Sequence, residues 1–291
     1  MSACKTAELS SRTVICVRGA DATDFLQNLV TNDVTRVQAS GAVHAGLLSP
    51  QGKILFDFLL AAAGDDGFLL DVRAEAADDL IKRLTFYRLR AKVELEKLPG
   101  RKVFALWDGA GEAAQGAVMF QDPRYAPLGS RLITGDDGAP PRGCELCDEA
   151  AYHAHRIACG VPEGGMDYAY GECFPHEADF DQLAGVDFSK GCYIGQEVVS
   201  RMQHRGTARK RIVPVTGEGE LSAGAPVTAE DSSIGTLGST AGRRGLAMVR
   251  LDRAEAALSQ GRVICAGDVP IRLLQPEWAS FSVPGTEGAI R

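Results

Sequence analysis

The sequence predicts an α+β protein that ends in a small all-β barrel or sandwich. Strand-like alternation and helix-like spacing follow one another in the first part of the chain. From about residue 208 onward, short strands are separated by glycine-rich turns. With 291 residues, 45% of them hydrophobic and 24% charged, the chain is large enough for two or three domains with cores of their own.

The first expected elements are a strand and a helix. "TVICVRG" (13–19) has the composition of a strand that ends at Gly19. Asp21 is suited to cap the following helix. The apolar face of that helix consists of Phe25, Leu26, Leu29 and Val30. "TNDV" (31–34) then ends it.

A sheet with a covering helix is predicted next. Residues 42–63 form two strands around a Pro-Gln-Gly turn, and residues 68–72 form a third strand. Residues 73–89 have helical spacing, and residues 91–98 alternate between apolar and polar side chains. This order is typical of a helix that covers one face of an antiparallel sheet. "KVFALWDG" (102–109) adds a further strand.

The middle of the chain is predicted to be less regular. Residues 108–143 are rich in Gly, Asp and Pro, and only "SRLIT" has the composition of a strand. Residues 144–160 are predicted to be a short helix that ends at Gly160. Residues 161–179 form a long, partly aromatic loop. Loops of this length within a compact protein are usually functional.

Composition excludes several classes of function. A net charge of −7 argues against direct nucleic-acid binding, which needs a basic face. No stretch approaches the roughly 20 apolar residues that span a membrane, so no membrane association is expected. The eight cysteines are scattered and follow no secretory leader. We therefore expect a cytoplasmic protein with free thiols.

One turn, "DFSKGCYIGQEVVSR" (187–201), combines a lysine, two glycines and a cysteine. Gly191 and Gly195 allow backbone conformations closed to other residues. If a helix begins near residues 194–196, its N-terminal end and Lys190 both favour the thiolate of Cys192, which attacks electrophiles or binds soft metals. The alternative is that Cys192 is a small buried side chain in a tight turn.

The sequence resembles the YgfZ group of folate-binding proteins, which help to mature iron–sulfur enzymes and share the fold of the glycine-cleavage aminomethyltransferase (T-protein). "VDFSKGCYIGQEVVSRMQHRGTARKR" resembles the signature of the group. Four other stretches occur in family order: "GADATDFLQNLVTNDV", "LLSPQGKILFDFLL", "YRLRAKVEL" and "HRIACGVPEG". The resemblance covers nearly the whole chain.

The resemblance implies three domains around a central folate-binding cavity. Residues 1–41 and 145–206 would form one α+β module, which carries the signature. Residues 42–144 would form a second α+β module, and residues 207–291 a C-terminal β-barrel.

The resemblance also assigns a role to Cys192, as functional thiolate or iron–sulfur cluster ligand, with Lys190 beside it. One thiolate cannot hold a cluster by itself. A transient cluster shared with an A-type carrier protein, and passed to client iron–sulfur enzymes, is therefore implied.

The acids that a T-protein uses near its folate are only partly present. Where the T-protein hairpin carries two aspartates, this chain has Phe56 and Asp57. Where its central helix places a glutamate against the pterin, this chain has Ala158. The resemblance therefore implies a fold without the full acid set of the transferase, and leaves open whether the chain is an enzyme.

Five residues remain as candidate contacts for tetrahydrofolate or a derivative of it. Tyr152 aligns with a tryptophan that contacts folate in a relative, and Arg156 follows on the same helical face. The others are Asn32, Asp57 and Lys190. The alternatives are that Tyr152 packs between domains and that Arg156 pairs with a surface acid.

The function expected from this resemblance is that of a folate-binding assembly or repair factor for [4Fe-4S] proteins. Two other functions remain open: a tetrahydrofolate-dependent aminomethyl or one-carbon transferase, and a folate-linked tRNA-modification factor. The basic run 201–211 motivates the last of these, although a solvated connector is the simpler interpretation. Cys144 and Cys147, with His153 and His155 nearby, form half of a metal or redox pattern. Solvent-facing helix residues are the alternative.

Overall fold

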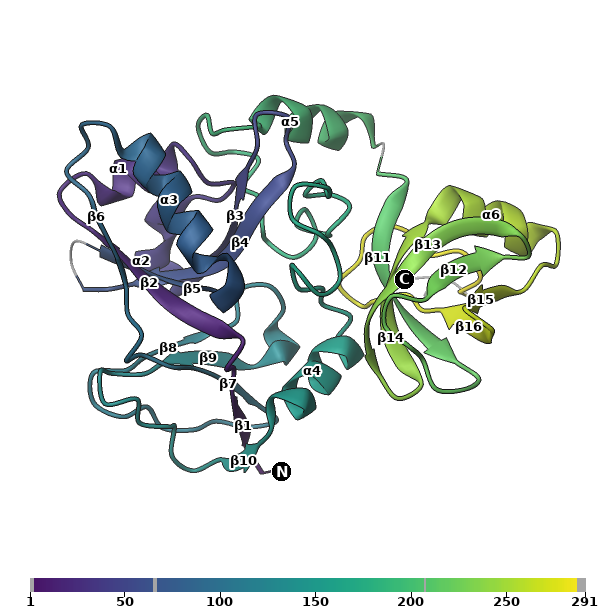
Figure 1. Ribbon diagram of the computed structural model, residues 1–291, viewed down its shortest axis with the longest axis horizontal. Helices are drawn as coiled ribbons and strands as arrows, with labels where there is room; N and C mark the ends of the chain where they lie inside the picture. Colours follow the sequence, from purple (N-terminus) through teal and green to yellow (C-terminus); the bar gives the residue numbers. More distant parts are fainter. Residues whose placement is uncertain (1–2, 65–66, 207, 287–291) are drawn as a thin grey trace. The chain divides into compact units, whose positions relative to one another are not determined.

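The structure is a computed structural model that describes residues 3–64, 67–206 and 208–286 (Figure 1). The chain forms two compact units. The first contains Met1–Tyr152 and Ala184–Gln196, and the second contains His153–Leu183 and Glu197–Arg291. None of the described helices is long and apolar enough to cross a membrane.

The first unit contains a five-stranded antiparallel sheet in the order β3-β4-β5-β2-β6. Its strands are β2 (Arg12–Arg18), β3 (Ala42–Leu48), β4 (Ile54–Ala62), β5 (Gly67–Arg73) and β6 (Glu94–Lys97). Three helices share a core with this sheet: α1 (Ala22–Gln27), α2 (Val37–Ser40) and α3 (Ala77–Arg88). The expected strands and the expected covering helix are therefore confirmed.

The two faces of this sheet bury different cores because side chains alternate along a strand. Ile15 and Val17 of β2 pack with the helices, in a core that includes Leu26 and Leu84. Val14 and Cys16 belong to a separate core, which also contains Trp107 and Tyr152. The sheet thus has one face toward the helices and one toward a second sheet.

The second sheet of this unit has the order β10-β1-β7-β9-β8. Its strands are β1 (Lys5–Glu8), β7 (Val103–Trp107), β8 (Val118–Gln121), β9 (Ser130–Ile133) and β10 (Glu145–Cys147). β1 pairs with β10 in parallel, and the other neighbours are antiparallel. β1 begins earlier than the first expected strand, and β10 occupies residues that were expected to be helical.

The sheets cross the module boundary that was expected at residue 41. β2 comes from the segment assigned to the first module, yet it pairs with β5 and β6 from the second. Sequence neighbours therefore separate into different sheets, because β1 and β2, joined by a short turn, each pair with strands that come much later in the chain.

The second unit is built on a closed six-stranded barrel in the order β11-β14-β13-β12-β15-β16, which confirms the expected barrel. Its strands are β11 (Lys210–Gly217), β12 (Pro226–Ala229), β13 (Ser232–Ala241), β14 (Arg244–Arg250), β15 (Ile264–Ala266) and β16 (Val269–Leu273). α6 (Leu251–Ser259), which the sequence analysis missed, contributes Ala254 and Ala257 to the barrel core.

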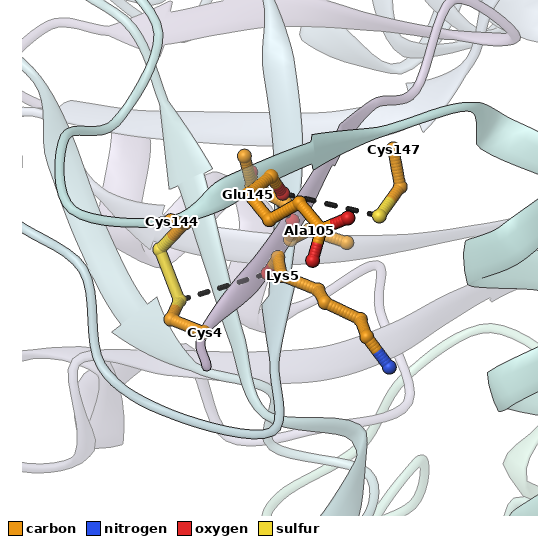
Figure 2. Close-up of a disulfide and its surroundings, with 7 residues drawn as sticks. Cys4, Lys5, Ala105, Cys144, Glu145 and Cys147 are labelled. Atoms are coloured by element: carbon orange, nitrogen blue, oxygen red, sulfur yellow. Dashed lines mark hydrogen bonds between the residues drawn. A yellow bond between two sulfur atoms is a disulfide. The ribbon is translucent and has the colours of Figure 1, made fainter. Parts of the chain in front are cut away.

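A disulfide joins Cys4 to Cys144, with their Cα atoms 4.5 Å apart (Figure 2). The parallel pairing of β1 with β10 brings these two residues together across 140 positions of sequence. A Cβ atom on Gly111 would lie 2.5 Å from Cys144 Sγ, so the neighbouring segment needs glycine to approach the bond. The expectation that all thiols are free is wrong for this pair.

Cys147 does not take part in this bond. It lies farther along β10, where its Sγ is 3.9 Å from the carbonyl oxygen of Glu145 (Figure 2). The Cys-x-x-Cys spacing therefore places one cysteine in a disulfide and leaves the other as a free thiol.

We expect Cys4→Ser with Cys144→Ser to lower the free energy of unfolding by about 3–5 kcal/mol, because the disulfide closes a long loop in the unfolded chain. Urea denaturation under non-reducing conditions measures the difference, and dithiothreitol should have the same effect on the wild type. Cys147→Ser is the matched control and should change little. Equal stability of the double variant and the wild type would contradict the prediction.

Candidate functional site

Cys192 lies in the loop that precedes α5 (Gln196–Arg205) and is a free, exposed cysteine. Its neighbours on both sides point inward: Lys190 is 9% exposed and Tyr193 is 8% exposed. No hydrogen bond to the Cys192 thiol is found among the described residues. The alternative of a buried Cys192 side chain is therefore wrong, and the expected helix start is confirmed. The loop 187–195 (hereafter the signature loop) presents the thiol outward.

The buried side chain of Lys190 anchors the signature loop. Its Nζ donates to the carbonyl oxygens of Gln27 at 2.8 Å, Val30 at 2.7 Å and Asn32 at 2.9 Å. Gln27 is the last residue of α1, and Val30 and Asn32 belong to the segment after it. An ammonium group has three hydrogens, so all of its donors are used. This geometry corrects the roles in catalysis and folate binding that were expected for Lys190: the side chain is a structural anchor.

The side chain of Asp187 fixes the start of the signature loop. Its Oδ1 accepts from Ser189 N at 2.7 Å, Ser189 Oγ at 2.6 Å and Lys190 N at 3.1 Å, while Oδ2 lies 3.2 Å from Arg36 Nη1. Burial by itself raises the pKa of Asp187, but the hydrogen bonds from Ser189 and the charge of Arg36 outweigh it. The pKa of Asp187 is therefore lowered, and the carboxylate is ionised at neutral pH.

The two glycines of the signature loop have different roles. Gly195 has a φ of +81°, and a Cβ atom there would lie 2.6 Å from the carbonyl oxygen of Ser49 in the β3–β4 turn. Only glycine permits both this conformation and this contact. Gly191 is not among the glycines with a positive φ, and a Cβ atom there would meet nothing within 4 Å, so the conformational need expected for Gly191 is not found.

Tyr152 lies in the core between the two sheets and is 1% exposed. The guanidinium carbon of Arg131 lies 4.8 Å from its ring centroid, and the ring centroid of Trp107 lies 5.9 Å away. The Tyr152 hydroxyl also accepts from Arg131 Nη2 at 2.6 Å. A pterin needs an open ring face to stack on, so this packing corrects the contact expected for Tyr152.

Arg156 is fully buried in the second unit, where it joins the irregular loop to the barrel. Its Nη1 donates to Asp167 Oδ2 and to the Val161 carbonyl oxygen, both at 2.7 Å, and its Nη2 donates to Ser239 Oγ at 2.7 Å. Its Nε is 3.5 Å from Glu163 Oε2. The guanidinium is therefore occupied, which corrects the expected contact with a folate carboxylate. Its acid partners, Asp167 and Glu163, are buried, so the alternative of a surface acid is wrong as well.

Asn32 lines a cavity of about 380 Å³ in the first unit. Its amide nitrogen donates to the carbonyl oxygens of His44 and Ala184. Asp57 is not among the lining residues, and its Oδ2 lies 3.9 Å from Nε2 of His44. Arg36 and His44 also line the cavity, and the sequence analysis missed both, because neither stands in a motif.

The basic run 201–211 is partly neutralised. Arg201 Nη2 pairs with Glu197 Oε1 at 2.5 Å, and Arg211 Nη1 pairs with Asp181 Oδ1 at the same distance. Arg211 is buried and begins the barrel strand β11 with Lys210. The run therefore leads into the first strand of the barrel, and two of its arginines are paired with acidic residues.

Two family models match the chain. One is described as the GCVT N-terminal domain and matches residues 1–107, and the other as the CAF17 C-terminal beta-barrel domain and matches residues 209–281. The crystal structure of the glycine cleavage system aminomethyltransferase T from Bartonella henselae superposes with a TM-score of 0.76 at 17% identity. It covers 96% of this chain and 87% of the other, and it confirms the expected T-protein fold.

Curated relatives are similar along most of the chain. The iron–sulfur cluster assembly factor IBA57, mitochondrial, of Homo sapiens is 35% identical over 296 residues, covering 90% of this chain and 83% of its own. The same factor of Mus musculus is 34% identical over 282 residues, covering 86% and 78%. Both names state a mitochondrial location, which contradicts the cytoplasmic location expected from the sequence.

We expect Asp187→Asn to reduce the free energy of unfolding by about 1–2 kcal/mol at pH 7, because it removes the charge that Arg36 and the loop amides stabilise. The lowered pKa means that this stabilisation is present above pH about 4 and is lost as the pH falls through the folded-state pKa. The difference in the free energy of unfolding between the variant and the wild type should therefore become smaller below pH about 4.

Urea denaturation at pH 7, 5 and 3 measures this difference. Asp24→Asn, at an exposed position on α1, is the matched control and should show no such dependence. A difference that stays constant with pH would argue against an electrostatic role for Asp187.

Proposed function

This chain belongs to the family of the iron–sulfur cluster assembly factor IBA57, and we propose that it acts by offering Cys192 as a ligand to an iron–sulfur cluster in transit. The observation that carries this proposal is an exposed, free thiol between two inward-pointing anchors, Lys190 and Tyr193. Cysteine thiolate is the usual ligand of such clusters.

The cluster is a substrate that the chain shares with other proteins. In residues 3–64, 67–206 and 208–286, no group of three or more His, Cys, Asp or Glu side chains gathers as a metal site. Cys192 therefore supplies one ligand, and the remaining thiolates come from a partner. An A-type carrier protein and client iron–sulfur enzymes are the partners that we propose.

The residues around Cys192 hold it ready for this exchange. The thiol must lose its proton to bind iron, and an outward-facing sulfur passes that proton to water. Lys190 and Asp187 fix the backbone on its N-terminal side, and Gly195 fits the other end of the loop against the β3–β4 turn. A fixed, open sulfur allows a partner's cluster to approach with little reordering of the chain.

Folate fits this chain only in part. Tyr152, Arg156 and Lys190 are occupied by protein contacts and do not fit a folate. The cavity of about 380 Å³ at Asn32 fits a pterin ring in size. We propose that a reduced folate binds there, where Asn32 Oδ1 has an acceptor position left and the exposed Arg36 meets the glutamate carboxylate. A reduced folate supplies one-carbon or redox chemistry when it is bound.

The alternative functions have less support. A one-carbon transferase needs acidic side chains at the pterin. Ala158 stands where the transferase has its glutamate, and Glu163 is paired with Arg156. A tRNA-modification role rested on the basic run, in which Arg201 and Arg211 are paired with acids.

We expect Cys192→Ser to reduce support of a [4Fe-4S] enzyme to the level of cells that lack the protein, because serine is a poor cluster ligand. The measurement is client-enzyme activity in a deletion strain, together with anaerobic reconstitution with an A-type carrier followed by absorption spectroscopy. Cys265→Ser, at a partly exposed free cysteine of the barrel, is the matched control. Full client activity in the Cys192→Ser strain would refute the role of this thiol.

We expect Arg36→Ser to weaken binding of 5-formyltetrahydrofolate by about tenfold, because it removes a charged partner of the glutamate carboxylate. Pteroate, which lacks the glutamate, should bind the variant and the wild type equally. Isothermal titration calorimetry measures both affinities, and Arg83→Ser on α3 is the control. A loss of pteroate affinity as large as the loss for the folate would show that Arg36 acts on the fold of the cavity instead.

A further inference from the structure

A second cavity of the first unit is separate from the features used above. It has a volume of about 1170 Å³ and lies beside the edge strand β6. The end of β2, residues 63, 64 and 67, the segment between α3 and β6, and the second sheet all contribute to its wall. Cavities that bind small molecules are typically about 300–1,000 Å³, so this one is large enough for an organic ligand.

Only some of the basic residues on the cavity wall are paired with acidic residues. Five basic residues line the cavity: Arg18, Arg88, Arg90, Lys92 and Arg101. Among the residues that the structure describes, the acidic lining residues are Glu94, Glu96 and Asp136, and each of them is paired with Arg18 or Arg101. Arg18 Nε lies 2.9 Å from Glu94 Oε2, and Arg101 Nε lies 2.9 Å from Asp136 Oδ1.

The excess positive charge is therefore on the segment from Arg88 to Lys92. Arg88 donates to the Val93 carbonyl oxygen at 3.4 Å. For the side chains of Arg90 and Lys92, no ion pair or hydrogen bond is found within the described part of the chain. In a chain with a net charge of −7, a cavity wall with two uncompensated cations selects anions.

The backbone of this segment is held in place. Lys92 N donates to Asp21 Oδ2 at 2.7 Å, and the Lys92 carbonyl oxygen accepts from Asp21 N at 3.4 Å. Gly19 has a φ of +127°, and a Cβ atom there would lie 2.2 Å from the same carbonyl oxygen. The segment is thus fixed against the end of β2, which reduces the ordering cost of binding a ligand.

The other walls are apolar. Leu69 and Val93 are buried, and Leu98 and Val118 are partly buried. Burial raises the pKa of the Cys16 thiol, so this lining residue is neutral and does not repel an anion. The cavity therefore offers an apolar surface beside a cationic segment.

We propose that this cavity binds a small organic anion, with a carboxylate or phosphate group against Arg90 and Lys92. The apolar body of the ligand lies over Leu98 and Val118. This site goes beyond the proposed function, because it uses neither Cys192 nor the cavity at Asn32.

The test uses 1-anilinonaphthalene-8-sulfonate, which combines an apolar body with one anionic group, and the full chain. The dye should show saturable binding to the wild type, and the double variant Arg90→Ser with Lys92→Ser should weaken its affinity by about tenfold. Lys82→Ser with Arg83→Ser on α3 removes the same charge away from the cavity and should leave the affinity unchanged. Val118→Trp fills the cavity without a change of charge and should weaken binding as well.

Two further measurements complete the test. Thermal melting should confirm that each variant is folded, since this dye also binds partly unfolded chains. Pyrophosphate and citrate then compete with the dye: displacement by the first indicates a phosphate ligand, and displacement by the second a carboxylate. The proposal is overturned if neither anion displaces the dye, or if the folded Arg90/Lys92 variant binds it with wild-type affinity.

Discussion

One buried ammonium group holds the candidate site together. Lys190 donates all three of its ammonium hydrogens to carbonyl oxygens at the end of α1 and in the segment after it, about 160 positions earlier in the sequence. Carbonyls at the end of a helix carry partial negative charge and favour a cation there. The signature loop is therefore fixed to the N-terminal part of the first unit two positions before Cys192, which is exposed.

The buried charges of this chain support the fold more than they bind ligands. Arg131 stacks on Tyr152 and approaches Asp122, Arg156 joins the irregular loop to β13, and Arg211 closes on Asp181. Each of these cations is costly to bury and is compensated by acids, carbonyls or a ring. A buried arginine with such partners has little free energy to gain from a further anion. Arg90 and Lys92 beside β6 differ, because the acidic residues near them are paired with Arg18 and Arg101.

Much of the fold could be predicted because its signals are local. The alternation in β2 and β4 and the helical spacing of α3 follow directly from which side chains enter a core. β1 and β10 were missed or misassigned because strands of three or four residues are too short to show a period, and their pairing joins distant parts of the sequence. The disulfide between them was hidden for the same reason. Cys192 could be predicted from its own turn, whereas the partners of Tyr152 and Arg156 are distant in sequence.

The distribution of sulfur has a practical consequence for chemistry on this protein. Cys4 and Cys144 are bonded to each other, Cys16 and Cys173 are buried, and the remaining free cysteines other than Cys192 are only partly accessible. A bulky maleimide or a spin label at limiting concentration would therefore attach first at the signature loop, without the removal of any other cysteine. A reporter can be set at the mouth of the site in the otherwise native chain, where it senses the arrival of a partner.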